Sequence, residues 1–127
     1  MSTTASYAAT PQNALVQVSA SNANRDGTGT IVDVLTAAAN GTRCDDITIT
    51  AVGTTTSGVV RLFLFDGAST RLWKEIMIPA NTPSTSISVF TIDIKGLALI
   101  LKSGWKLRAS TNNAETFNIA VTRCGDF

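Results

Sequence analysis

Side chains that could do chemistry are few in this chain of 127 residues, which contains no histidine. Histidine is the usual general base near neutral pH and the commonest metal ligand, so its absence removes Ser-His triads and most hydrolytic mechanisms. The only adjacent carboxylates are Asp45 and Asp46. Neighbouring strand residues point to opposite faces, so this pair is badly placed to act on one bond. The sequence therefore predicts a protein that is not an enzyme and that uses no cofactor.

Three kinds of binding site find weak support. Asp26-Gly27 lies in a turn-rich loop, but the regular acidic spacing of an EF-hand is missing. Gly27 and Gly29 precede a predicted strand rather than a helix, so a phosphate-binding loop does not apply. Trp73 and Trp105 have the side chains that stack on sugars, yet each has an apolar residue two positions away. This spacing favours the core for both tryptophans, and no metal, phosphate or sugar site is predicted.

The remaining reactive groups are Cys44 and Cys124, each preceded by arginine and each at the end of an expected strand. Two cysteines alone do not make a metal site. If the last strand lies antiparallel to the strand that holds Cys44, a bridge would close about 80 residues and contribute about 4.5 kcal/mol. Three alternatives stay open at this point: buried free thiols, an intrachain disulfide, and a bond between subunits.

Short runs of alternating apolar and polar residues are separated by Gly, Asn, Pro and Ser, and no apolar run has helical spacing over a useful length. This pattern predicts an all-β fold, an eight-stranded antiparallel β-sandwich of jelly-roll type, with an immunoglobulin-like sandwich as the alternative. The segment 96–101 is apolar without a clear period and fits either a strand extension or a loop. The expected strands are residues 14–21, 30–37, 43–52, the two arms of a hairpin within 58–79, 86–94, 104–111 and 115–124.

The hairpin turns at Asp66-Gly67 and is expected at the centre of the fold. Both faces of its first arm are apolar, interrupted by Arg61, which indicates burial from two sides. Either a neighbouring sheet or a neighbouring subunit is expected to cover the second face. The aromatic residues predicted for the core or an interface are Phe63, Phe65, Trp73, Trp105 and Phe117.

The composition limits the classes of partner that the protein is expected to bind. Only 15% of residues are charged and the net charge is +1, which suits either a surface in contact with other protein or a neutral extracellular β domain. No basic cluster suggests nucleic acid, and no apolar run approaches the length of a membrane span. The first residues lack the pattern of a secretory signal, so synthesis in the cytoplasm is expected. Residues 1–12 are predicted to be a flexible arm, and residues 13–127 a single β-sandwich domain.

Several short motifs together suggest a family. They are Asn-Arg-Asp-Gly-Thr-Gly-Thr at 24–30, Thr-Thr-Thr-Ser-Gly at 54–58, Val-Arg-Leu-Phe at 60–63 with Asp66-Gly67, Arg-Leu-Trp at 71–73, and Leu-Arg-Ala-Ser-Thr-Asn-Asn-Ala-Glu-Thr-Phe at 107–117. With these motifs, residues 13–127 resemble the small virion structural proteins of tailed bacteriophages that bind the outside of the capsid as decoration or cement proteins. Cys44 and Cys124 are not part of that pattern.

The resemblance implies a β-sandwich that assembles as a homotrimer on the lattice of the major capsid protein. Such a protein is made in the host cytoplasm, ends on the capsid surface of the virion, and stabilises the shell against the packed genome. A tail-fibre or receptor-binding module of the virion is the alternative. That module would share the β-rich composition but should carry exposed aromatic or acidic groups in its loops.

Overall fold

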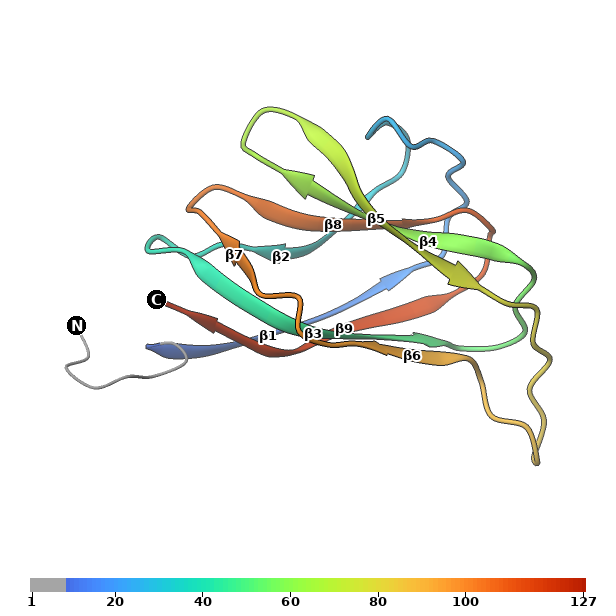
Figure 1. Cartoon of the computed structure of the whole chain (residues 1–127). Coiled ribbons are helices and arrows are strands. Elements are labelled where there is room, and N and C mark those ends of the chain that lie inside the picture. Colours follow the sequence, from blue (N-terminus) through green and yellow to red (C-terminus); the bar gives the residue numbers. More distant parts are fainter. Residues whose placement is uncertain (1–8) are drawn as a thin grey trace.

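The computed structural model describes residues 9–127, and this part of the chain consists of nine strands joined by turns and loops, without a helix (Figure 1). The predicted all-β sandwich of two antiparallel sheets is confirmed. The strands are β1 (Thr10–Val18), β2 (Val32–Thr36), β3 (Thr42–Ala51), β4 (Gly58–Phe65), β5 (Thr70–Ile78), β6 (Thr91–Ile94), β7 (Leu99–Leu101), β8 (Lys106–Thr111) and β9 (Phe117–Asp126).

The strands form two sheets that face each other (Figure 1). One, called here the β1 sheet, has the order β1-β9-β3-β6, and β7 also pairs with β3. The other, the β2 sheet, has the order β2-β8-β4-β5. All neighbouring strands within the sheets are antiparallel.

Strands β6 and β7 share one edge of the β1 sheet. β6 pairs with residues 47–50 of β3, and β7 pairs with residues 42–44 of the same strand. Between them the chain leaves the sheet, and Gly96 and Ala98 both have positive φ angles. Such angles are incompatible with a continuing strand. The nine strands therefore fill eight positions, four in each sheet, and the apolar segment 96–101 is in part the strand extension that the sequence allowed.

The first strand begins earlier than expected. Thr10, Pro11 and Gln12 already pair with Asp126, Gly125 and Cys124 of β9. These three residues, assigned from sequence to the flexible arm, are thus the start of an edge strand. Residues 1–8 of the predicted arm lie outside the described residues, and its flexibility stays a prediction.

The core lies between the sheets and consists of every second residue of the long strands. Each fully buried aliphatic or aromatic side chain contributes about 1.5–3 kcal/mol relative to an exposed one. The side chains of β3 and β9 come from one sheet and those of β4 and β8 from the other, and all are closed off from solvent. The inward residues of these four strands include Ile47, Ile49, Phe117, Ile119, Val121, Val60, Leu62, Leu107 and Ala109.

The hairpin is less central than the sequence indicated. Its first arm, β4, lies between β8 and β5, but β5 is an edge strand. The pairing of the two arms shifts between Leu62 and Phe63, so that Trp73 is an extra residue on β5. A bulge of this kind is common on edge strands, where it twists the edge.

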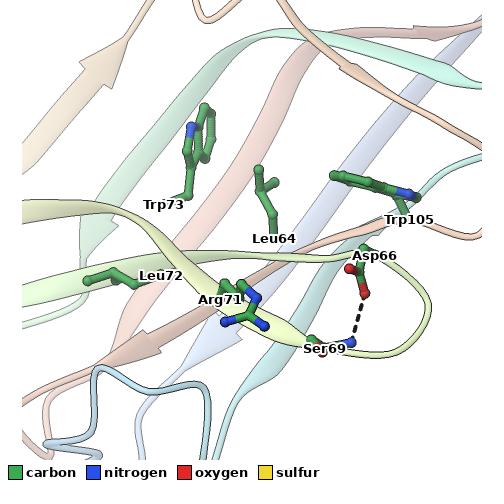
Figure 2. A pocket seen from close by; sticks show the side chains of 7 residues that line it. All are labelled: Leu64, Asp66, Ser69, Arg71, Leu72, Trp73 and Trp105. Carbon is green, nitrogen blue, oxygen red and sulfur yellow. Dashed lines mark hydrogen bonds between the residues drawn. The ribbon is translucent and has the colours of Figure 1, made fainter.

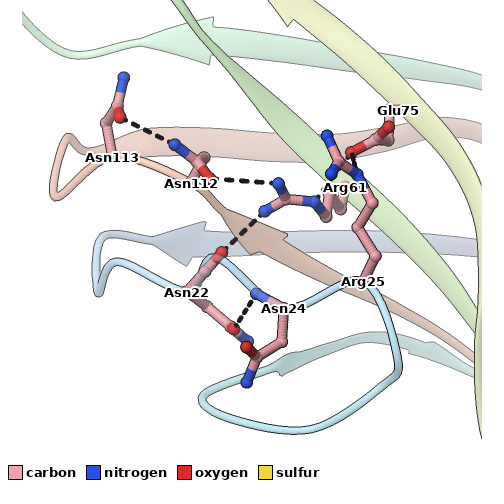
Figure 3. A network of polar contacts seen from close by, with 7 residues as sticks. All are labelled: Asn22, Asn24, Arg25, Arg61, Glu75, Asn112 and Asn113. Atoms are coloured by element: carbon pink, nitrogen blue, oxygen red, sulfur yellow. Dashed lines mark hydrogen bonds and ion pairs between the residues drawn. The ribbon is translucent and has the colours of Figure 1, made fainter.

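The second face of the hairpin is covered in part, around Arg61, by the chain itself. The loop of residues 19–31, which joins β1 to β2, lies against the outer face of the β2 sheet, and Arg61 is buried there (Figure 3). Its guanidinium donates hydrogen bonds to the carbonyl oxygen of Asn22 (2.7 Å) and to Oδ1 of Asn112 (3.1 Å), and it pairs with Glu75 (2.9 Å). Arg25 of the loop binds the same carboxylate oxygen of Glu75 at 2.7 Å. The loop thus covers Arg61 on the face for which the sequence predicted a neighbouring sheet or a neighbouring subunit.

Gly27 brings the loop close to β5. Its φ angle is +88°, and a Cβ at this position would collide with the backbone carbonyl of Thr70. Glycine is therefore required at this position for two reasons, the positive φ angle and the close approach of the backbone to β5.

Candidate functional site on the open face of the β1 sheet

The outer face of the β1 sheet differs from that of the β2 sheet because its central part is open to solvent. Each long strand directs one set of side chains inward and the other outward, and the register aligns the outward residues into rows across four strands. These rows define what we call the open face. One row is Leu15, Ala120, Thr48 and Asp93, and the other is Gln17, Asn118, Thr50 and Thr91.

The open face is nearly uncharged. In its two rows Asp93 is the single ionisable residue, and its carboxylate accepts a hydrogen bond of 2.7 Å from the Thr48 hydroxyl. The amide of Gln17 donates to the Oδ1 of Asn118 at 2.9 Å. Leu15 is 76% exposed in the same surface. Short amide, hydroxyl and methyl groups thus lie side by side on a pleated surface without long charged side chains.

Charged groups gather instead on the outer face of the β2 sheet. Asp33 pairs with Lys106 at 3.1 Å and with Arg108 at 2.7 Å. The Arg108 guanidinium also lies over the Phe65 ring, 4.1 Å from its centroid, and the Lys106 ammonium lies 5.9 Å from it. Cation–π contacts of this kind contribute about 0.5–1 kcal/mol at exposed sites. The two rows of the open face therefore lack the ion pairs that the outer face of the β2 sheet carries.

The adjacent carboxylates take structural roles. Asp45 is buried and pairs with Arg43 at 3.2 Å and with Arg123 at 4.0 Å. Asp46 accepts a hydrogen bond of 3.3 Å from the backbone N–H of Gly96. Asp45 is thus a buried, paired carboxylate rather than a solvated one. Among residues 9–127, no three histidine, cysteine, aspartate or glutamate side chains gather as a metal site would require.

The two cysteines are brought together. Cys44 of β3 is the register partner of Cys124 of β9, both are buried, and both are free thiols. The hydrogen bond with Cys124, and then burial, raises the pKa of the Cys44 thiol. The same hydrogen bond lowers the pKa of Cys124, because a thiol that donates to a thiolate stabilises it.

The two tryptophans frame a notch at the tip of the β4–β5 hairpin. The cavity has a volume of about 210 Å³ and is lined by apolar side chains and by residues of the hairpin turn. In Figure 2 the Trp73 and Trp105 rings stand on either side of Leu64, whereas Arg71 points away from them. Both tryptophans are half-buried and pack against the core. The preference for a core position over an exposed platform is therefore only partly correct.

The other predicted aromatic residues fall in different layers. Phe117 is buried in the core between the sheets. Phe63 is buried on the opposite face of β4, the face of Arg61, and Phe65 follows two residues later beneath the cations of β8. The sequence did not predict the open face, although the alternation within residues 43–52 and 115–124 places Thr48, Thr50 and Asn118 opposite the apolar residues of their strands. The order of the strands, which turns these sets into one surface, has no counterpart in the sequence.

Comparison with known proteins gives limited results. No family model matches the chain, and no curated protein matches it. Two crystal structures of a pentameric capsid protein isolated from metagenomic phage sequences resemble it. The first is 16% identical with a TM-score of 0.41 over 86% of this chain, and the chain spans only 62% of its length. The second is 17% identical with a TM-score of 0.30, covering 81% of this chain and 69% of the other.

One prediction is affected by these neighbours, both of which are described as phage capsid proteins. The predicted homotrimer is contradicted, since both neighbours are described as pentameric, and we withdraw it. In residues 9–127 there is no helix with the length and apolar character that a membrane span needs.

Proposed function

We propose that this protein is a non-enzymatic structural protein of a phage virion, and that it binds the outside of the capsid as a decoration or cement protein through the open face of the β1 sheet. The observation that carries the proposal is the pair of nearly uncharged rows across four strands of that sheet. The resemblance of residues 13–127 to decoration proteins supports the same assignment.

The physical argument concerns the cost of removing water. Charged side chains are expensive to desolvate, and the buried centre of protein interfaces is depleted of them. Thr50 and Asn118 can exchange hydrogen bonds with water for hydrogen bonds with a partner, and Leu15 adds apolar area. Asp93 already accepts a hydrogen bond from Thr48, so its carboxylate keeps one partner when water leaves. A flat surface of this kind suits contact with another protein.

A repeating shell strengthens weak contacts. When one contact holds a protein beside further sites on the same lattice, the next contact forms at a high effective concentration. β1 is the edge strand of the open sheet and begins at Thr10. The proposal assigns binding to this surface and no chemical step.

The test compares two charge insertions at exposed apolar residues. Leu15 on the open face is 76% exposed, and Met77 on β5 of the other sheet is 82% exposed. Leu15→Lys should lower binding to shells of the phage that encodes the protein by at least about tenfold, because a desolvated ammonium without a partner costs more than about 1.4 kcal/mol. Met77→Lys should bind as the parent does. Equal binding of both variants would reject the open face as the contact surface.

Shell stability is measured in the same series. Shells decorated with the parent or with Met77→Lys should release their genome at a higher temperature than bare shells, and shells mixed with Leu15→Lys should behave as bare shells. Antibody labelling of intact virions in the electron microscope shows whether the protein lies on the head or on the tail. Label confined to the tail, or equal release temperatures for bare and decorated shells, would reject the cement function.

One observation favours a receptor-binding module of the virion as the second candidate. The notch beside Trp73 and Trp105 leaves two indole rings partly accessible at a hairpin tip, and indole faces stack on sugar rings. Binding of the protein to host cell-surface polysaccharide, lost in Trp73→Ala and kept in Leu15→Lys, would support this candidate. No binding to the polysaccharide by the parent would remove it.

A further inference from the structure

The two cysteines occupy positions at which a disulfide can form without rearranging the sheet. Cys44 and Cys124 lie directly opposite each other on antiparallel strands, and both side chains belong to the core between the sheets. Opposed residues in such a pair have Cα atoms about 4.5–5.5 Å apart. Disulfides span Cα distances of about 4.4–6.8 Å. The backbone of β3 and β9 thus already holds the required spacing.

The location also distinguishes the three alternatives that the sequence left open. Both thiols are buried inside one chain and hydrogen-bonded to each other. A bond between subunits would have to draw one sulfur out of the core, so it is disfavoured by the geometry. Free thiols and an intrachain disulfide remain, and the redox surroundings decide between them.

We propose that Cys44 and Cys124 are a redox-controlled cross-link, reduced during folding in the cytoplasm and closed to an intrachain disulfide by exchange with a small-molecule disulfide in oxidising surroundings. Closure would join β3 to β9, the two central strands of the open face. This inference does not depend on the proposed function, because it concerns the chain alone.

The reaction with glutathione disulfide balances in two steps. The Cys124 thiolate, which the Cys44 thiol stabilises by a hydrogen bond, attacks one sulfur of glutathione disulfide, forms a mixed disulfide and expels one glutathione thiolate. Cys44 then loses its proton, and its thiolate attacks the Cys124 sulfur and expels the second glutathione. Two cysteine thiols are oxidised, one glutathione disulfide is reduced, and the two cysteine protons end on the two glutathione thiols.

Access to the sulfurs requires local opening of the sheet. β9 is covered on one side by β1, where Gln12 pairs with Cys124, and β3 is covered by β7, where Leu99 pairs with Cys44. Exchange in the native protein should therefore be slow and limited by opening of these pairings. Oxidation during refolding should be faster, because the strands are then exposed to the reagent.

The experiment uses the full-length chain, refolded or incubated in reduced and oxidised glutathione buffers. Intact mass and thiol titration in denaturant report the bond, and thermal unfolding reports its effect. We expect a monomeric species that lacks two hydrogens and both thiols, with an unfolding midpoint raised by about 10 °C, since a closed loop of about 80 residues constrains the unfolded chain. Dithiothreitol should reverse both changes.

The double variant Cys44→Ala/Cys124→Ala is the matched control and should unfold at one midpoint in both buffers. Retention of both thiols after refolding in the oxidising buffer would overturn the proposal. So would a disulfide that links two chains, recognised by its doubled mass under non-reducing conditions. If the parent loses its thiols but its midpoint does not move, the bond exists and the stabilising part of the proposal is wrong.

Discussion

The buried guanidinium of Arg61 donates a hydrogen bond of 2.7 Å to the backbone carbonyl of Asn22, which ties the loop of residues 19–31 to the outer face of the β2 sheet. This contact explains why a charged residue lies within a strand that is otherwise apolar on both faces. Arg61 exchanges water for Asn22, Asn112 and Glu75, and the loop shields the result from solvent. Among the described residues 9–127, Leu15 on the open face of the other sheet is 76% exposed.

The first prediction concerns this buried arginine. Arg61→Met should lower the free energy of unfolding by about 3–5 kcal/mol, because it leaves the Asn22 carbonyl unpaired and removes a partner from Glu75. Arg25→Ala is the control, since Arg25 binds the same carboxylate but is 62% exposed, and it should cost less than about 1 kcal/mol. Urea unfolding measures both values. Similar losses of unfolding free energy in Arg61→Met and Arg25→Ala would contradict the central role of the buried Arg61 in this network.

The second prediction tests how closely the loop approaches β5. Gly27→Ala should destabilise by about 2–4 kcal/mol, because the new methyl group combines a strained positive φ with a collision at the Thr70 carbonyl. Gly67→Ala is the matched control. Gly67 has a φ of +97° but no atom within 4 Å of its added Cβ, so only the strain of about 1 kcal/mol remains. A loop that tolerates Gly27→Ala as well as Gly67→Ala would not be packed as described.

The pH dependence of stability gives the third prediction. The hydrogen bond from Arg25, and then that from Arg61, holds the pKa of Glu75 below its ordinary value. A carboxyl group whose pKa is lowered by folding stabilises the fold above its unfolded pKa of about 4.3, and this contribution is lost as the pH falls through the folded value. The parent should therefore exceed Glu75→Gln in stability at pH 7 and approach it near pH 3. A difference that stays constant from pH 7 to pH 3 would contradict this assignment.

The sequence located most of the strands, but the expected strand 86–94 begins only at Thr91, and β7 was left undecided. Alternation of Ile47 and Ile49 with Thr48 and Thr50 located β3 to within one residue at each end, because burial of one face imposes a period of two. The sequence also indicated that Cys44 would meet Cys124 if their strands were antiparallel neighbours, and they are. Local periodicity carries this kind of information well.

Other features depend on contacts between segments that are distant in the sequence, and such contacts produce no periodic pattern of residues. The loop of residues 19–31 reads as a series of turn formers, and nothing in that composition shows that it covers Arg61. The arginine itself was the useful sign, since a buried charge in an apolar strand requires a partner. The hairpin was placed at the centre because it is the most apolar segment. The bulge at Trp73 and the edge position of β5 follow from pairing, which apolar content does not encode.

The last prediction separates the two large aromatic residues that the sequence placed in the core. Phe117 is fully buried between the sheets, and Phe117→Ala should cost about 3–5 kcal/mol. Trp105, which the sequence also placed in the core or at an interface, is half-buried, and one side of its ring borders the notch. Water can enter the space left by the Trp105 ring, because that space opens into the notch. Trp105→Ala should therefore lower the free energy of unfolding by only about 2 kcal/mol. Denaturant midpoints with unchanged slopes measure both losses. Equal losses would mean that Trp105 is packed as tightly as Phe117 and that the notch is closed in solution, which would also remove the basis of the receptor-binding candidate.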